Sequence, residues 1–461
     1  MYTKTLTNYT ICKEFTIKRA IIFNENDVSY LYNTLNGRGL FLKESLLKKL
    51  LNGKVDENFL FLMIQRGIFE TNDNIIDLHD SKPTFFLINL TDSCNLRCMY
   101  CFRDVHIKES VNINSNELKK ICQKIIEYCK NHKVNRIFVQ PWGGEPLISY
   151  EKIIEIDDIF RQTDLEYQIV LSTNATLVTS EVARALFHRK VHVGISLDGN
   201  EELQNLQRPF KNRETNSFQE VCKGIQNLRD AGYGDIGVIC TITKINIDRI
   251  EDILNVFINE IKLHTVKLNL VKTNPFSPES EYIAVSDTDK INRFYDVLID
   301  TIINTNRRGY NFFERNLCDK IVNLFGNNTG NICVSRGCLG GDKMIAVNRQ
   351  GDIFPCDLVD VEKVKIGNLF SDFTVPDMIE QSKKENPFFQ SNVMEICNEC
   401  PWKIYCEGGC SASVIYNGEK GQCVDHLECR INQILYPKLL SLALKNPEAI
   451  WYLTNKKIKI L

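Results

Sequence analysis

Residues 93–102 read Ser-Cys-Asn-Leu-Arg-Cys-Met-Tyr-Cys-Phe, directly after a strand-like segment. The stretch places Cys94, Cys98 and Cys101 at C-x3-C-x2-C spacing, with an aromatic residue after the last cysteine. Three thiolates can hold three irons of a [4Fe–4S] cluster and leave the fourth iron free to chelate a small molecule, whereas ferredoxin-type clusters use four cysteines. The alternatives are a zinc site that lacks one ligand and a chance grouping in a cysteine-rich chain. The spacing favours the iron–sulfur site.

At these residues the chain resembles the radical S-adenosylmethionine (SAM) enzymes, with Tyr100 and Phe102 flanking the third cysteine. The resemblance implies that Cys94, Cys98 and Cys101 bind a [4Fe–4S] cluster whose open iron holds the amino and carboxylate groups of SAM. It also implies that reductive cleavage of SAM gives methionine and a 5'-deoxyadenosyl radical. That radical would abstract a hydrogen atom from a carbon of the substrate.

The composition is that of a chain of 461 residues, 43% hydrophobic, with a net charge of −2. This is enough for two or three domains, each with its own core. Residues 1–15 are too polar for a signal peptide, and no apolar stretch approaches the roughly 18 to 20 residues that span a bilayer. We therefore expect a cytoplasmic protein with no membrane partner, whose clustered cysteines are metal ligands rather than disulfides. The net charge gives no reason to expect a nucleic acid partner.

The pattern of the chain divides it into segments 1–83, 84–310 and 311–435, followed by a short tail, 436–461. In the first segment, β-like runs precede two helical stretches, an order that suggests a winged-helix-like module. Residues 1–80 carry ten Lys or Arg against ten Asp or Glu, so a basic surface for DNA is missing. The segment resembles the N-terminal recognition element of peptide-modifying SAM enzymes, which implies that a leader peptide adds a strand to its sheet edge. The alternative is a purely structural extension.

The central segment alternates strand-like and helix-like stretches in the rhythm of a parallel α/β fold. Asn114 and Glu117 are spaced as a capping box before a helix, and Cys122 and Cys129 fall on its apolar face. The count of strands matches the partial (β/α)6 barrel of the radical SAM enzymes, where chemistry lies at the C-terminal ends of the strands. The predicted strands cover residues 84–90, 136–141, 167–172, 191–197, 236–243 and 265–271.

Polar motifs fall at the ends of these predicted strands. The motif Gly143-Gly144-Glu145-Pro146 follows the second strand, where its glycines would let the backbone approach a ligand and Glu145 offers acceptors for an ammonium. The resemblance implies that this motif holds the amino group of SAM. Further positions that it assigns to the ribose and methionine pocket are Ser172, Asn174 and Ser196.

Arg208 matches the family arginine that follows the Asp-Gly turn after the fourth strand, and its guanidinium could pair with the SAM carboxylate. The alternative is an ordinary surface salt bridge. The usual histidine of this loop is replaced by Gln204 or Asn205, which leaves the roles in the loop less defined.

A second cysteine array occupies the third segment and resembles the SPASM signature of peptide and protein maturases, whose fold binds two auxiliary [4Fe–4S] clusters. The resemblance assigns the first cluster to Cys338, Cys356 and Cys410, and the second to Cys397, Cys400, Cys406 and a later cysteine. Zinc is the alternative, because Cys-x2-Cys pairs also build zinc ribbons. With the site at Cys94 to Cys101, the expectation is three [4Fe–4S] clusters.

Two ligand positions in this array stay open. Spacing favours Cys429 over Cys423 as the last ligand of the second auxiliary cluster. Cys333 could close the first auxiliary cluster as its fourth ligand. Without Cys333, that iron would be open and could bind a substrate thiolate directly.

Asp357 follows Cys356 and matches the Asp that acts as the base in sulfatase-maturing relatives, although an ordinary turn residue is the alternative. Together, these features predict a radical SAM maturase that installs a cross-link, with a cysteine thioether as the expected bond, in a ribosomally made peptide. Expected partners are the precursor peptide and an electron donor such as flavodoxin or ferredoxin. The alternatives are anaerobic sulfatase maturation to formylglycine and a non-catalytic iron–sulfur or zinc regulator that binds DNA.

Overall fold

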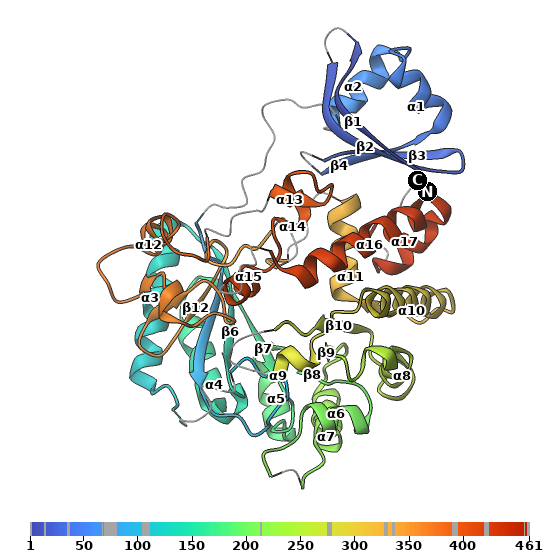
Figure 1. Cartoon of the computed structure of the whole chain (residues 1–461). Coiled ribbons are helices and arrows are strands. Elements are labelled where there is room, and N and C mark those ends of the chain that lie inside the picture. The colour runs from blue at the N-terminus through green and yellow to red at the C-terminus, as the bar shows by residue number, and fades with distance from the viewer. Residues whose placement is uncertain are drawn as a thin grey trace.

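Among the residues that the structure describes, the strands form two β-sheets, one of four strands near the N-terminus and one of ten strands in the body of the molecule. The structure is a computed structural model (Figure 1). It describes residues 2–12, 15–34, 37–66, 68, 81–103, 111–212, 214–273, 279–326, 331–333, 337–389, 395–418, 424–455 and 457–458. None of the described helices is both long enough and apolar enough to cross a membrane.

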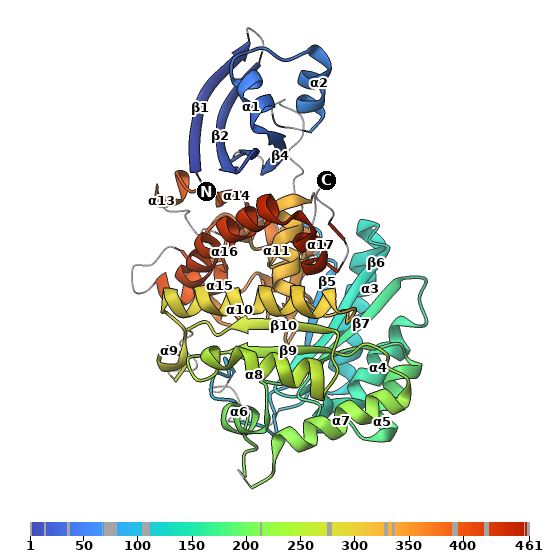
Figure 2. The same ribbon diagram turned by 90° about the vertical axis from the view of Figure 1, so that its right-hand side faces the viewer.

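Parallel strands β5 to β10 form the centre of the large sheet and confirm the six predicted strands. They are β5 (Phe85–Thr91), β6 (Arg136–Gly143), β7 (Glu166–Thr173), β8 (His192–Ser196), β9 (Gly237–Ile242) and β10 (Thr265–Leu270). Their alternating buried residues are mostly Ile, Leu and Val, which suit a sheet covered by helices. Connecting helices cover one face of this sheet (Figure 2), namely α3 (Ser115–His132), α4 (Tyr150–Phe160), α5 (Ser180–His188), α7 (Ser217–Ala231) and α8 (Ile250–Asn255).

Helix α3 forms as the sequence indicated. The Asn114 side chain accepts hydrogen bonds from the backbone at Asn116 and Glu117, and the Glu117 side chain accepts one from the Asn114 backbone. This capping box satisfies amide groups that the first helical turn leaves without partners. Cys122 and Cys129 lie on the buried face of α3, as predicted.

The cysteine-rich segment continues the barrel sheet, which the sequence did not predict. Strand β12 (Met344–Val347) pairs in parallel with β5, and β13 (Asp352–Phe354) and β14 (Gly367–Asn368) follow in antiparallel order. At the opposite edge, β11 (Phe313–Glu314) pairs with β10. The expected boundary at residue 310 therefore does not separate two sheets. The β5–β12 pairing places the auxiliary segment directly beside the first barrel strand.

The N-terminal module is a four-stranded antiparallel sheet followed by two helices. Its helices pack on the sheet around a core of Leu, Ile, Ala and Met side chains. Strand β1 was not predicted, because its alternating threonines give little apolar signal; among its described side chains only Leu6 is buried. The elements are β1 (Tyr2–Cys12), β2 (Phe15–Glu25), β3 (Val28–Asn33), β4 (Arg38–Lys43), α1 (Glu44–Leu51) and α2 (Glu57–Gln65).

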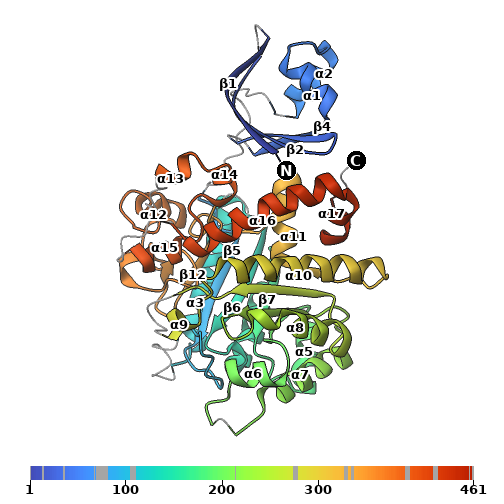
Figure 3. The same cartoon turned by 45° about the vertical axis from the view of Figure 1, so that its right-hand side comes forward.

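Helices near the C-terminus lie between this module and the barrel, as Figures 1 and 3 show. Helix α16 (His426–Lys445) contacts β2 and β3, and α11 (Arg315–Phe325) contacts β4. The expected tail at 436–461 is not a separate unit. Tyr436 and the following apolar residues of α16 remain buried, so the helix runs through that boundary. Helices α10 (Thr288–Arg307) and α17 (Pro447–Leu453) complete this layer.

Aromatic side chains join the module to the second cysteine array. Trp402 stacks on Phe23 with ring centroids 5.8 Å apart, and Tyr405 stacks on Tyr32 at 6.0 Å. The Tyr405 hydroxyl donates a hydrogen bond to the carbonyl of Gly37 at 2.6 Å. Trp402 and Tyr405 lie between two predicted cluster ligands, so the module rests directly on a ligand-bearing loop.

Candidate functional site

The loop with the first three cysteines begins at the C-terminal end of β5 and is held on two sides. On one side, the amides of Gly144 and Glu145 donate to the carbonyls of Thr91 and Ser93 at 2.9 and 2.8 Å. On the other side, the amides of Arg97 and Met99 donate to the carbonyls of Pro209 and Gln207 at 2.8 and 2.9 Å. Two motifs separated by sixty residues in sequence are therefore brought together around the cysteines.

The two glycines of the Gly-Gly-Glu-Pro motif allow the motif to pack closely against the backbone that leads into the cysteine loop. A Cβ atom at Gly143 would lie 2.0 Å from the Thr91 carbonyl oxygen, and one at Gly144 would lie 2.2 Å from that of Ser93. Gly143 also has φ of +144°, which side chains disfavour. The sequence suggested that these glycines let the backbone approach a ligand. In the structure the neighbour that they approach is the backbone of the cysteine loop.

Glu145 is 2% exposed and is fixed at the ends of β6 and β7. Its Oε1 accepts from the Thr173 hydroxyl at 2.6 Å, and its Oε2 accepts from the Asn174 amide at 2.7 Å. Burial raises the pKa of Glu145, although these donors oppose the rise. A cationic ligand would favour the ionised form. The Asn174 side chain donates to Asn95 Oδ1 at 2.8 Å, which ties β7 to the cysteine loop.

Arg208 is buried beside the first cysteines rather than exposed at the surface. Its Nε lies 3.0 Å from Asp198 Oδ2, its Nη1 lies 4.0 Å from Cys98 Sγ, and its guanidinium lies 5.2 Å from the centroid of the Tyr100 ring. Asp198 is fully buried and also accepts from the Thr241 amide at 2.8 Å and from the Tyr100 hydroxyl. Asp198 belongs to the motif after β8 but was not among the predicted contact residues; in the structure it orients both Arg208 and Tyr100.

The other residues that were predicted to contact SAM do not lie together in one place. Ser172 and Ser196 are half-buried at the C-terminal ends of β7 and β8. Phe102 packs instead in an apolar cluster with Trp142 and Cys356. It therefore faces the auxiliary cysteines, whereas Tyr100 faces Arg208.

Cys356, Cys338 and Cys410 of the predicted first auxiliary site belong to or pack against one apolar cluster, whereas Cys333 is exposed. Burial, followed by the nearby Cys410 and Cys333, raises the pKa of the Cys338 thiol to about 12. Burial likewise raises the pKa of Cys356, together with Asp357, Cys338 and Cys410. These thiols therefore lie close enough to one another to interact electrostatically. Cysteine thiols lose their protons when they bind a metal. Whether Cys333 is a ligand stays a prediction.

The predicted second auxiliary site is a single cavity lined by Cys397, Cys400, Cys406 and Cys429. Cys429 comes from the first turn of α16, and the other three come from the segment before it. Burial raises the pKa of the Cys406 thiol to about 12. Four thiols around one cavity fit a four-cysteine cluster. The alternative ligand Cys423 lies outside the described residues.

Arg103 connects the cysteine loop to the auxiliary segment and was missed by the sequence reasoning. Its guanidinium pairs with Asp92 at 2.6 Å and with Asp360 at 2.9 Å, and it lies 4.4 Å from the centroid of the Trp142 ring. Asp357, the predicted base, is half-buried in the same region. Burial raises the pKa of its carboxyl, whereas the Arg103 charge opposes that rise.

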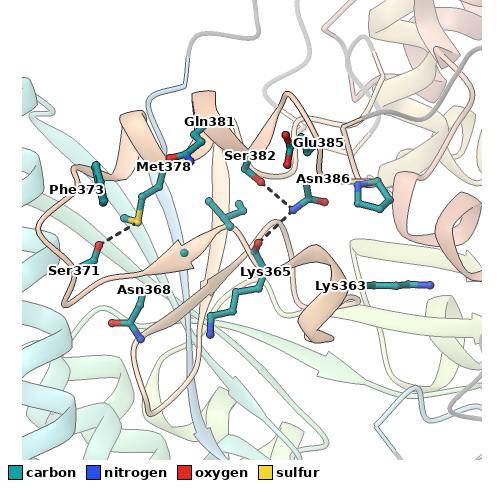
Figure 4. Close-up of a pocket in the computed structure, with 13 residues that line it drawn as sticks. Lys363, Lys365, Asn368, Ser371, Phe373, Met378, Gln381, Ser382, Glu385 and Asn386 are labelled. Atoms are coloured by element: carbon teal, nitrogen blue, oxygen red, sulfur yellow. Dashed lines mark hydrogen bonds between the residues drawn. The ribbon is translucent and has the colours of Figure 1, made fainter.

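A separate hollow of about 480 Å³ lies between β14 and α12 (Val375–Ser382) (Figure 4). Asn386 donates to the neighbouring Ser382 hydroxyl at 2.9 Å on one wall of the hollow, and Lys365 and Met378 also contribute to its wall. None of its lining residues is a predicted ligand or SAM contact. This hollow is therefore not part of the candidate site.

Comparison with known families matches residues 88–257 to the radical SAM superfamily and residues 338–401 to the SPASM iron–sulfur cluster-binding domain. A cysteine-type anaerobic sulfatase-maturating enzyme of Clostridium perfringens is 24% identical over 341 residues, which are 71% of this chain and 89% of that protein.

Two solved structures share the fold. The anSMEcpe structure with bound AdoMet and Cp18Cys peptide has a TM-score of 0.66 at 20% identity and covers 79% of this chain and 100% of that one. Streptococcus suis SuiB bound to precursor peptide SuiA has a TM-score of 0.53 at 17% identity and covers 86% of this chain and 94% of that one.

The first cysteine array lies within the radical SAM match, and Cys338, Cys356, Cys397 and Cys400 of the second array lie within the SPASM match, whose ends leave out the remaining predicted ligands. These matches favour iron–sulfur clusters over zinc and catalysis over the non-catalytic regulator considered above. The chain belongs to the radical SAM enzymes that carry a SPASM domain, and it binds iron–sulfur clusters and SAM.

Proposed function

We propose that this enzyme is a maturase that installs a cysteine thioether cross-link in a ribosomally synthesised precursor peptide, using three [4Fe–4S] clusters. The observation that carries the proposal is the N-terminal module, a folded sheet docked by Trp402 and Tyr405 onto the second auxiliary site. SuiB, with its bound precursor peptide, aligns with 86% of this chain, whereas the anSMEcpe structure leaves about a fifth of it unmatched.

The residues at the C-terminal ends of the barrel strands and in the auxiliary segment would have separate roles in binding SAM and in the reaction. Glu145 would hold the ammonium of SAM, and Arg208, oriented by Asp198, would hold its carboxylate. When bound, the first cluster and SAM would supply the 5'-deoxyadenosyl radical that takes a hydrogen atom, and the auxiliary clusters would supply an acceptor for the remaining electron. Asp357 would take the proton of the substrate thiol. An external donor such as flavodoxin or ferredoxin would supply the electron for SAM cleavage.

The module would bind the leader of the precursor. Its sheet order leaves β1 and β4 as edge strands, and an extended peptide binds such an edge through main-chain hydrogen bonds. The docking of the module onto the Cys400–Cys406 segment would then deliver the core peptide to the auxiliary side of the barrel.

The test is the intact mass of a cysteine-containing precursor peptide after anaerobic co-expression with the wild type and with Cys101→Ala. Formation of one thioether removes one hydrogen from carbon and one from sulfur. We therefore expect a loss of two hydrogen atoms per cross-link with the wild type alone. An unchanged peptide with an enzyme that cleaves SAM would contradict the proposal.

Sulfatase maturation is the second candidate, favoured by the match to a cysteine-type sulfatase-maturating enzyme over 71% of this chain. It would convert an active-site Cys or Ser of a sulfatase to formylglycine, with Asp357 as the base. Incubation of the reconstituted enzyme with a sulfatase-derived peptide separates the two functions. Formylglycine reacts with hydrazide reagents, whereas a thioether does not.

A further inference from the structure

The cavity of the second auxiliary site has a polar wall that no motif indicated. Helix α16 forms this wall, because Asn432 and Gln433 follow Cys429 at i+3 and i+4 and share its face. The Gln433 side chain donates to Cys400 Sγ at 3.3 Å. Asn432 is 2% exposed and also lines the cavity. One helix thus supplies a predicted ligand and two side-chain amides to the same site.

Lys320 of α11 fixes the orientation of the Asn432 amide. Its Nζ donates to Asn432 Oδ1 at 2.6 Å and also pairs with Glu428. An ammonium can only donate, so the amide oxygen must face Lys320 and the amide nitrogen must face away from it.

The amide nitrogen of Asn432 is a buried donor in need of an acceptor. Nδ2 makes no well-formed hydrogen bond to a described residue, although the Cys406 thiol and the Glu428 carboxylate lie within its reach. The Asn432 amide lies close to the Cys406 thiol. Burial raises the pKa of this thiol, and the amide lowers it. The amide also lies near the Glu428 carboxylate, which Lys320 already engages. Buried donors are rarely left unsatisfied, so an acceptor is expected in the cavity.

We propose that Asn432 and Gln433 donate N–H···S hydrogen bonds to the second auxiliary cluster, and that Lys320 holds the Asn432 amide in its donating orientation. This inference rests on the cluster that the proposed function places at these cysteines. Hydrogen bonds to the sulfurs favour the more negative, reduced cluster and raise its reduction potential. The second auxiliary cluster is thereby the better electron acceptor after substrate oxidation. Lys320 is a positioning residue because it acts through Asn432, whereas Asn432 and Gln433 would contact the cluster themselves.

The test is an EPR-monitored redox titration of the full-length, iron- and sulfide-reconstituted enzyme. The signal of the second auxiliary cluster is identified by its loss in Cys406→Ala. We expect Asn432→Leu to shift its midpoint to a more negative value. At the wild-type midpoint, the ratio of oxidised to reduced cluster should rise about tenfold, which corresponds to about 59 mV for one electron. Gln433→Leu should cause a smaller shift in the same direction, because Gln433 is exposed.

Matched variants separate the hydrogen bond from simple charge. Lys320→Met with Glu428→Gln removes the ion pair without a net charge change and should still lower the potential, because the amide loses its orientation. Lys438→Met removes a lysine of α16 that pairs with Asp296, and it should leave the potential unchanged. Asn432→Asp keeps the shape of the side chain, turns the donor into an acceptor and adds a negative charge. Both changes should lower the potential, so this variant tests the site if the leucine variant folds poorly, and the charge-neutral pair above isolates the hydrogen bond.

Deuterium exchange followed by pulsed EPR gives a direct readout. The wild-type signal should show coupling to an exchangeable deuteron that Asn432→Leu and Asn432→Asp lack. Unchanged potentials and couplings in foldable variants, with the cluster present, would overturn the inference and leave the proposed function standing. Iron content for two clusters, with no signal that depends on Cys406, would instead contradict the proposed cluster itself.

Discussion

Replacement of Gly144 by alanine should disable SAM cleavage without unfolding the protein. The new Cβ would lie 2.2 Å from the Ser93 carbonyl oxygen, and ordinary contact begins near 3.4 Å, so the motif and the cysteine loop must separate by about 1 Å. That movement breaks the hydrogen bonds from Gly144 to Thr91 and from Glu145 to Ser93, at 2.9 and 2.8 Å. Each contributes about 0.5–1.5 kcal/mol, so about 1–3 kcal/mol of local stabilisation is lost.

A loss of about 1.4 kcal/mol in the stability of the reactive arrangement lowers a rate about tenfold. We therefore expect Gly144→Ala to form 5'-deoxyadenosine at least tenfold more slowly than the wild type, measured by chromatography after dithionite reduction. Gly237→Ala in β9 is the matched control, because a Cβ there meets no atom within 4 Å. Gly144→Ala could instead form 5'-deoxyadenosine at the wild-type rate while its iron content and melting temperature are normal. That result would refute the idea that this packing holds the cysteine loop.

Three further outcomes are expected. Asp198→Asn leaves the Arg208 charge buried without its partner, so stability should fall by about 3–5 kcal/mol and the melting temperature with it. Trp402→Ala removes the stacking on Phe23, and limited proteolysis should then release the N-terminal module faster than from the wild type. Burial raises the pKa of Glu314 to about 7, so the folded state retains a proton that the unfolded state loses near pH 4.5. The free energy of unfolding should therefore fall by up to about 3 kcal/mol between pH 4.5 and 7, and Glu314→Gln should abolish that slope in melting temperatures.

The features that were predicted correctly from the sequence are those that depend on short stretches of the chain. The barrel strands carry runs of Ile, Leu and Val between helices with clear apolar faces, and Asn114 with Glu117 marked the start of α3. The cysteine spacings identified both arrays because cluster ligands must follow one another at short, fixed intervals.

The features that were missed depend on contacts between distant segments. No local signal in residues 344–347 says that β12 pairs with β5 rather than with a strand of its own segment. Arg103 was not singled out, and the contacts of Asp198 were not foreseen, because their partners come from other elements of the fold. The i+3 and i+4 positions after Cys429 could have been found, since a ligand on a helix predicts neighbours on the same face.

The pairing of β12 with β5 limits how this enzyme can be recombined with its relatives. A chimaera joined near residue 310 would separate two strands held in register from Met344 opposite Phe85 to Val347 opposite Ile88. An unmatched partner would leave an apolar strand edge open to aggregation. Exchange of the auxiliary segment between relatives should therefore succeed only when β5 travels with β12, so that these two strands form the smallest transferable unit.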